Sequence, residues 1–317
     1  MSNPSAALGG RLSPTTTHGT PRSVIPSRLA QAGQRIGHAT RRSPLGMAAV
    51  ITLALVLVTI LLEPWLPLPA RDATALTDRL QGPLTRGADG TLHLLGTDQL
   101  GRDVLARTLY GGRISLGIAC GAVLVSGLVG TMLGLLAGYR GGWLDTMVMR
   151  LVDFQMAMPS LLLAIFLLYL LGASVPNLVI LLSILGWPSY TRLVRSETLG
   201  LRHATFVEGA VVSGARQSRI LVRHILPQIF PVLLVVTVFD FSAVVLAEAG
   251  ISFLGFGVQP PQTSWGRMIS EGQQFITTGA WWLFAAPGLA IFLTVLCVRL
   301  GSGWIAQVMG TRDSTLH

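Results

Sequence analysis

The chain has 317 residues, of which 51% are hydrophobic and only 12% are charged. A soluble domain carries roughly twice this charged fraction, so the composition argues against the two soluble domains that the length alone would permit. The net charge of +9 comes from arginine, because the sequence contains no lysine.

Long apolar blocks separate the charged segments. A block of about 18 or more such residues can cross the hydrocarbon core as a helix, which satisfies its own backbone polar groups. The fourth block looks short because Arg192 and Arg195 follow it, and we expect its helix to continue past them. The sequence therefore predicts an all-α membrane protein with six spans: Leu45–Leu62, Ile114–Gly138, Thr146–Leu171, Leu178–Tyr190, Gln228–Leu254 and Trp281–Leu300.

The arginines gather on one side of this arrangement. The tail Met1–Pro44 has six arginines and no acidic residue, and Thr191–Pro227 has six arginines against two glutamates. On the opposite side, Glu63–Arg113 has six residues of each sign. An arginine excess on one side is the positive-inside pattern, which predicts that both termini lie in the cytosol. The charge therefore does not require a nucleic-acid partner.

Three parts of the chain follow from this pattern. Residues 1–44 are too poor in apolar side chains to order themselves, and we expect a disordered cytosolic tail. Residues 45–300 form the transmembrane domain, with an outer loop at 63–113 and a cytosolic loop at 191–227. Residues 301–317 form a cytosolic C-terminal tail.

The outer loop ends in GTDQLGRDVLARTLYGGRISL, Gly96–Leu116. Thr97 or Asp98 can cap a helix that runs to about Tyr110, and we expect Gly111–Gly112 to break that helix before the second span.

The charged residues of this motif leave two interpretations open. Asp98 and Arg102 are four residues apart and can pair on a helix. They can belong to a structural helix at the membrane interface, which we favour. Alternatively, Asp98, Arg102 and Asp103 form part of a docking surface for an extracytoplasmic partner.

Small residues recur at a spacing of four in the second span, at Gly117/Gly121 and at Gly130/Gly134/Gly138. This spacing lets helix backbones approach closely in a membrane, so we expect a tightly packed bundle. Prolines, which kink helices or mark their ends, interrupt other spans at Pro159, Pro188, Pro231 and Pro287.

The most informative segment is the cytosolic stretch Ser196–Val235. It is compatible with helix up to Ser213 and breaks at Gly214, where glycine permits a left-handed turn. It then resumes as a short basic segment and meets Pro227 as the next span begins. We expect two short helices that project from the membrane. With small residues such as Gly209 and Ala210, they can enter a groove on a partner. On spacing alone, a cap without a partner is an equal alternative.

This segment resembles the "EAA" loop of ATP-binding-cassette importer permeases. The family pattern is E-A-A, three residues, G, nine residues, then I-x-L-P, and the spacing here is intact. Gly209 replaces the first Ala, and His224 takes the Ile position, as is usual in the peptide-permease branch. In the family this loop forms the coupling helix that sits in a cleft of the ATPase. The resemblance therefore implies coupling roles for Glu208, Gly209, Ala210, Gly214, His224, Leu226 and Pro227.

Other stretches resemble the same family. Gly96–Leu116 and Leu246–Gly272 are similar to segments of the dipeptide, oligopeptide and nickel permeases, and Phe284–Leu296 fits their last span. A single span before GTDQLGRD looks like the second, C-type permease of the peptide operons. The resemblance covers roughly Leu45 to Leu300, whereas the C-terminal GSGWIAQVMGTRDSTLH departs from the family's G-D-G-L-R-D-like run.

The resemblance implies a six-helix type I importer transmembrane domain in the bacterial cytoplasmic (inner) membrane. Its partners would be a homologous permease, two ATPase subunits and an extracytoplasmic substrate-binding protein. The implied function is ATP-driven import of di- or oligopeptides, with nickel or glutathione import as the alternative. The chain lacks a G-x-x-x-x-G-K-[ST] phosphate loop, so we expect it to be non-catalytic and to bind no cofactor or metal, with ATP and Mg²⁺ on the partners.

Two acidic residues lie within the fifth span. Asp240 and Glu248 are eight residues apart, which places them within about 80° on a helix. An ionisable residue inside a span is costly and therefore a candidate functional residue, here one that lines the translocation path and meets a peptide amine. Alternatively each pairs with a neighbouring helix, or Glu248 lies at the outer interface. We interpret Asp153, near the inner end of the third span, as structural.

Two other classes of protein remain as alternatives. A secondary transporter or channel would need no ATPase, and its loop at 196–227 would have no task. A membrane-embedded enzyme lacks support, since the sequence has no Ser/His/Asp grouping and no H-E-x-x-H motif.

Overall fold

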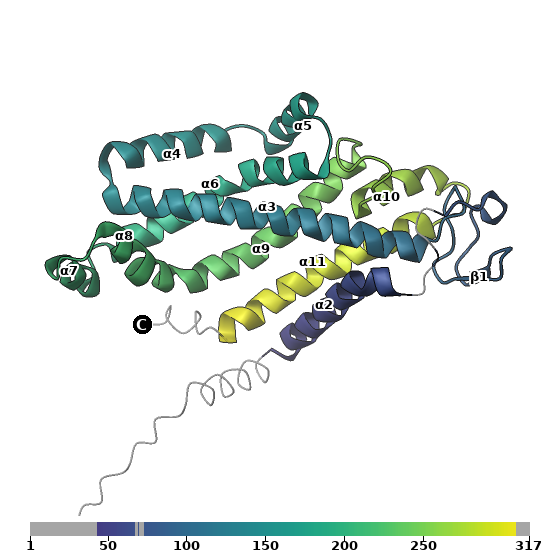
Figure 1. The fold of residues 1–317 in the computed structure, drawn as a ribbon, viewed down its shortest axis with the longest axis horizontal. Coiled ribbons are helices and arrows are strands. Elements are labelled where there is room, and N and C mark those ends of the chain that lie inside the picture. The colour runs from purple at the N-terminus through teal and green to yellow at the C-terminus, as the bar shows by residue number, and fades with distance from the viewer. Residues whose placement is uncertain (1–42, 67–68, 70–72, 309–317) are drawn as a thin grey trace, which may run out of the picture.

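The computed structural model describes residues 43–66, 69 and 73–308, and in this part the chain folds as an elongated bundle of helices (Figure 1). The long helices are α2 (Pro44–Leu62), α3 (Val104–Arg140), α4 (Gly142–Met156), α5 (Ser160–Leu171), α6 (Val175–Leu201), α9 (Leu226–Phe253) and α11 (Trp282–Val308). The shorter elements are α7 (Thr205–Val212), α8 (Gln217–Ile220), α10 (Trp265–Gly272), the 3-10 turns η1 (Glu63–Trp65), η2 (Leu76–Asp78) and η4 (Gln273–Phe275), and the π-helical turn η3 (Leu221–Ile225).

Five of the described helices are long and apolar enough to cross a membrane, and the bent pair α4–α5 makes a sixth crossing if it counts as one span. This confirms the predicted all-α membrane protein. One antiparallel hairpin, β1 (Thr85–Arg86) with β2 (Leu92–His93), lies at the end of the bundle that carries α10. We call this the α10 end and the opposite end, which carries α7, the α7 end (Figure 1).

Helix α3 packs closely along α6 through glycines. The prediction is confirmed for Gly130, Gly134 and Gly138 but not for Gly117 and Gly121. A Cβ atom on Gly134 would lie 2.7 Å from the backbone oxygen of Thr191, and Gly130 and Gly138 face α6 equally closely. Gly121 meets only the side chain of Val179, and Gly117 meets nothing within 4 Å. The backbones therefore approach closely in the half of α3 nearest α7.

The expected helix from Thr97 or Asp98 to Tyr110 is wrong. Asp103 caps α3, since its Oδ1 accepts a hydrogen bond from the backbone of Ala106 at 2.8 Å, and the helix then runs without a break to Arg140. Gly111–Gly112 does not end it, because these glycines serve close packing. A Cβ on Gly112 would lie 2.8 Å from the indole ring of Trp265 on α10.

The predicted third span is not one helix. Helices α4 and α5 meet at a bend of 92° around Pro159. Proline lacks a backbone N–H and disfavours helix at the residue before it, which explains the break. Pro188, Pro231 and Pro287 lie inside helices, so of the four prolines only Pro159 falls at a helix end.

Helix α2 packs on α11 at the edge of the bundle. A Cβ on Gly46 would lie 2.8 Å from Cβ of Trp304, and one on Gly301 would lie 2.9 Å from Val50. Helix α2 begins and α11 ends toward the α7 end (Figure 1). Helix α11 continues to Val308, beyond the predicted span end at Leu300, whereas most of the predicted tail 1–44 lies outside the described residues.

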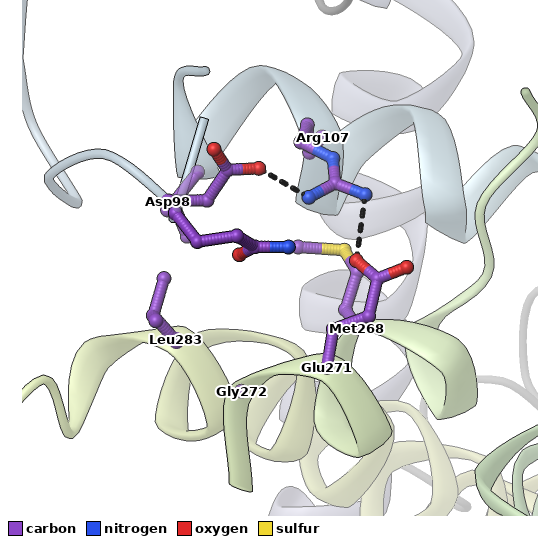
Figure 2. A pocket seen from close by; sticks show the side chains of 8 residues that line it. Asp98, Arg107, Met268, Glu271, Gly272 and Leu283 are labelled. Atoms are coloured by element: carbon purple, nitrogen blue, oxygen red, sulfur yellow. Dashed lines mark hydrogen bonds and ion pairs between the residues drawn. The ribbon is translucent and has the colours of Figure 1, made fainter. Parts of the chain in front are cut away.

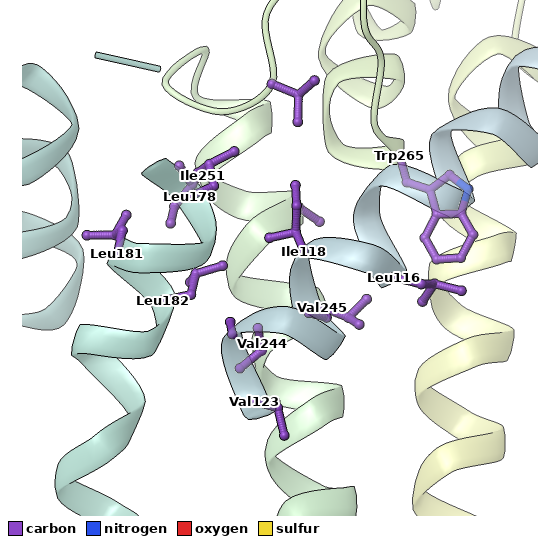
Figure 3. Packing of buried hydrophobic residues seen from close by; sticks show 14 of the residues in the cluster. Leu116, Ile118, Val123, Leu178, Leu181, Leu182, Val244, Val245, Ile251 and Trp265 are labelled. Atoms are coloured by element: carbon purple, nitrogen blue, oxygen red, sulfur yellow. The ribbon is translucent and has the colours of Figure 1, made fainter. Parts of the chain in front are cut away.

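The main core lies where α3, α6 and α9 meet below α10 (Figure 3). Ile118 of α3, Leu178 and Leu181 of α6, and Val245 of α9 are fully or almost fully buried there. Trp265 closes this core from α10 and donates a hydrogen bond from Nε1 to the backbone oxygen of Thr108 at 2.8 Å. The core thus fixes α10 to the long helices.

Candidate functional site

The segment between α6 and α9, residues 202–225, lies beyond the long helices at one end of the molecule (Figure 1). It contains α7, a turn at Gly214, α8 and η3, after which α9 begins. We call it the α7–α8 segment. It confirms the expectation of two short helices separated at Gly214.

The turn at Gly214 is set by the backbone. Gly214 has φ +76°, a conformation that a residue with a Cβ rarely adopts. The amide of Gly214 donates to the oxygen of Val211 at 2.9 Å, and the amide of Ala215 donates to that of Ala210 at 3.0 Å. These bonds satisfy carbonyls at the end of α7, so the turn has one defined geometry.

Apolar side chains anchor the α7–α8 segment to the bundle. Val207, Ile220 and Ile225 are almost fully buried, in one cluster with Leu135 of α3 and Val194 of α6. At the same place Nε of Arg140, the last residue of α3, donates to Oε1 of Gln217 at 3.3 Å. The α7–α8 segment is therefore packed directly against α3 and α6.

The tip of the segment is apolar and exposed. The exposed fraction is 88% for Val212, 53% for Val211 and 42% for Phe206. Glu208 and Gly209 are exposed beside them, and a Cβ on Gly209 would meet nothing within 4 Å. An apolar tip of this kind is typical of a surface that a partner covers.

The remaining residues of the motif lie at the root of the segment. His224 and Leu226 are half-buried, and Leu226 packs against the cluster that anchors α7. Pro227 stands in the first turn of α9, directly after the π-helical turn η3. Glu208, Gly209, Ala210 and Gly214 thus lie toward the tip, whereas His224 to Pro227 lie where the segment joins α9.

The two acidic residues of α9 have different surroundings. Glu248 is fully buried, next to Ser115 and Ser264, and its Oε1 accepts a hydrogen bond from Ser252 at 2.6 Å. Asp240 is half-buried at the edge of α6, and its Oδ2 would lie 3.8 Å from a Cβ on Gly186. The fold therefore does not bring Asp240 and Glu248 together on one surface.

Oδ2 of Asp240 lies near the hydroxyl of Tyr190, but neither atom makes a hydrogen bond of good geometry in the described part of the chain, and the same holds for Oε2 of Glu248. A buried polar atom without a partner is costly, which makes it a candidate for contact with something outside this chain.

The charged residues of the outer-loop motif are buried. Asp98 is 2% exposed, and its Oδ2 accepts from Nε of Arg102 at 2.7 Å, in a loop rather than on the expected helix. Asp103, the cap of α3, is 3% exposed, and its Oδ2 lies 2.8 Å from Nδ1 of His93 in β2. This burial favours the structural interpretation over an exposed docking surface.

An ion-pair network around Arg107 was not predicted from the sequence (Figure 2). Nη1 of Arg107 donates to Oδ2 of Asp98, and its Nη2 donates to Oε2 of Glu271 on α10 at 3.1 Å. Glu271 also accepts from Nε of Arg267 at 3.0 Å. The only sign of it in the sequence was that Arg107 stands among apolar residues. In the structure Arg107 is 6% exposed.

Helix α4 is tied to α6 by ion pairs near the α7 end. Nη2 of Arg192 lies 2.9 Å from Oδ1 of Asp153, and Nη2 of Arg195 lies 2.7 Å from Oδ2 of Asp145. Asp153 therefore links two helices, which agrees with its interpretation as structural.

Comparisons with known proteins bear on the described helices and on the α7–α8 segment. A family model described as "Binding-protein-dependent transport system inner membrane component" matches residues 130–310. The chain is 38% identical over 251 residues to a dipeptide transport system permease protein of Alkalihalophilus pseudofirmus, covering 78% of this chain and 80% of that protein.

Two further relatives are named for different substrates. A di/tripeptide transport system permease protein of Pseudomonas aeruginosa is 36% identical over 281 residues, with 88% of this chain and 91% of that protein covered. A glutathione transport system permease protein of Pectobacterium atrosepticum is 41% identical over 224 residues, with 70% and 72% covered.

Proposed function

Because the chain belongs to the family of binding-protein-dependent transport system inner membrane components, we propose that it is the permease subunit of an ATP-driven importer of di- or oligopeptides. The observation that carries this proposal is the α7–α8 segment, a projection with an exposed apolar tip and a buried root. A secondary transporter or channel has no use for such a projection.

In this proposal the chain forms half of the translocation path and a homologous permease forms the other half. Two partner ATPases bind ATP and Mg²⁺. One of them binds the α7–α8 segment of this chain, and the other binds the corresponding segment of the homologous permease. ATP shifts the permease pair between inward-facing and outward-facing states only if the ATPases bind one state more tightly. This chain transmits the movement from α7, through Val207 and the buried cluster, to α3 and α6. It needs no cofactor or metal of its own.

We place the α7 end and both termini in the cytosol and the α10 end outside. The arginine excess of the tail Met1–Pro44 and of Thr191–Pro227 supports this orientation. Helix α2 begins toward the α7 end and helix α11 ends toward it, which agrees with an even number of membrane crossings between them (Figure 1). The α10 end is then free to meet the substrate-binding protein.

Asp240 is the residue that we assign to the translocation path. The residue is partly exposed and its buried Oδ2 lacks a hydrogen bond of good geometry, so contact with a peptide amine requires the carboxylate to turn toward the exposed side. Glu248 has no such role in this proposal because no face of it is exposed.

The assignment of the cargo is tested by measuring uptake into two kinds of cell. Both contain the other subunits of the transport system, and only one contains this chain. Labelled dipeptide, tetrapeptide, glutathione and nickel are offered separately. We expect ATP-dependent uptake of a peptide to be lost with the chain and restored by the gene. Loss of glutathione uptake alone would favour the second candidate, which the 41% identity to the glutathione permease supports. Unchanged uptake of all four would contradict the proposal.

A further inference from the structure

Five charged side chains of alternating sign cross the α10 end: Arg102, Asp98, Arg107, Glu271 and Arg267. Each neighbouring pair is an ion pair, with nitrogen–oxygen distances of 2.7 Å for Arg102–Asp98, 3.1 Å for Arg107–Glu271 and 3.0 Å for Arg267–Glu271. Arg107 stands in the middle and contacts both carboxylates (Figure 2). We call these five residues the Arg107 network.

The network joins segments that are far apart in the sequence. Asp98 belongs to the loop that follows the β-hairpin, Arg107 to the start of α3, and Glu271 to α10. Arg267 extends the connection, because its Nη1 donates to the backbone oxygen of Val258 at 3.3 Å and to Oε1 of Gln259 at 3.2 Å. The loop that carries Asp98, which we call the hairpin loop because it follows the β-hairpin, is thus connected to α3. Helix α10 and the loop between α9 and α10 are connected to α3 as well.

The centre of the network is shielded from solvent. The side chains of Asp98 and Arg107 are 2% and 8% exposed, and the cavity beside them measures about 10 Å³, room for about one water molecule. A buried ion pair adds little stability compared with apolar packing, but loss of one partner leaves the other charge uncompensated. The network therefore specifies one arrangement of these segments rather than simply strengthening the fold.

We propose that Arg107 is a positioning residue for the binding protein: it holds the hairpin loop, α10 and the α9–α10 loop on α3 as one docking platform. This inference rests on the proposed function, which places the α10 end outside the cell. Helix α3 then runs 37 residues from this platform to Arg140, whose hydrogen bond to Gln217 reaches the α7–α8 segment. A platform held in one arrangement binds its partner without first having to be ordered.

The test uses the complete importer in lipid nanodiscs and measures ATP hydrolysis against the concentration of its binding protein, loaded with the dipeptide Ala-Ala. In Arg107→Gln we expect the half-saturating concentration to rise roughly 5- to 150-fold, while the maximal rate is retained. Arg113→Gln is the matched control, because Arg113 is also on α3 but its side chain is 42% exposed and, among the described residues, forms an ion pair only with Glu63, at 3.3 Å. Its half-saturating concentration should equal that of the wild type.

Glu271→Gln gives the same test if Arg107→Gln does not assemble, since it preserves the shape of the side chain and removes its charge. We expect a rise in the half-saturating concentration here too. An unchanged half-saturating concentration in an assembled variant, or a fall in maximal rate alone, overturns the positioning role. If ATP hydrolysis by the wild-type importer does not depend on the concentration of the binding protein, the proposed function itself is overturned, and with it this inference.

Discussion

Gly214 and Gly209 belong to the same motif but meet different physical demands. Gly214 has φ +76°, so its lack of a side chain permits the backbone turn that ends α7. Gly209 lies inside α7, where a Cβ would have no other atom within 4 Å and an alanine would fit without a clash. The family pattern has alanine at this second position.

These two glycines provide a matched pair of variants. Gly214→Ala should strain the turn by about 1–2 kcal/mol and lower the amount of cargo carried per ATP hydrolysed. Gly209→Ala should stabilise α7 by roughly 0.5–1 kcal/mol and leave that ratio unchanged. The measurement is uptake and ATP hydrolysis in the same reconstituted vesicles. Equal ratios for Gly214→Ala and wild type would count against a coupling role for the turn.

Local rules could predict Gly214 but not the surroundings of Asp240 and Glu248. The turn at Gly214 depends on backbone conformation, which glycine spacing indicates directly. Glu248 is buried because Ser252 and neighbouring elements surround it, and helix periodicity carries no information about those neighbours. For the same reason the sequence predicted the pairing of Asp98 with Arg102, four residues away, but not that of Arg107 with Glu271, since these two residues are 164 positions apart.

Helices α3 and α6 form the closest helix pair near the α7 end. Gly134 faces backbone atoms of α6, with 2.7 Å between the position of an added Cβ and the oxygen of Thr191, whereas Gly117 faces open space. Side chains of α3 and α6 also pack against the root of the α7–α8 segment. We therefore expect the distance between these two helices to affect how tightly that segment packs on the bundle.

Alanine at these two positions separates packing from helix propensity. Gly134→Ala should push α6 away and cost roughly 1–3 kcal/mol, which lowers the melting temperature by about 2–4 °C per kcal/mol. Gly117→Ala should leave the melting temperature unchanged or raise it slightly. Thermal unfolding of the purified complex in detergent provides the comparison. A Gly134→Ala protein as stable as Gly117→Ala would show that the close approach is not required.

Hydropathy predicted the existence of the spans better than their interruptions. The run Thr146–Leu171 reads as one apolar block because hydropathy is blind to direction, and only Pro159 signalled the bend between α4 and α5. The continuity of α3 through Gly111–Gly112 was missed for a related reason. Gly111–Gly112 reads locally as a helix breaker, whereas the structure uses these residues to admit Trp265.

At the scale of the whole molecule, α3 joins the two ends. It has 37 residues, about 55 Å at 1.5 Å per residue, with the Arg107 network at one end and the hydrogen bond of Arg140 at the other. The apolar blocks predicted the membrane-spanning helices from sequence, because they reflect the membrane rather than specific contacts. Pro159 marked the position of the bend between α4 and α5, but the angle of that bend and the ion pairs of Arg107 depend on tertiary contacts and were not predicted.

The central claim is that the tip of the α7–α8 segment sits in a partner ATPase on the cytosolic side. Cysteine crosslinking tests it most directly, with Cys120 and Cys297 replaced by alanine and Val212→Cys, 88% exposed, as the probe. Leu128→Cys, 65% exposed in the middle of α3, is the control. We predict that Val212→Cys crosslinks to the ATPase and Leu128→Cys does not. Labelling of Val212→Cys in intact cells by a membrane-impermeant thiol reagent, without any crosslink to the ATPase, would contradict the account.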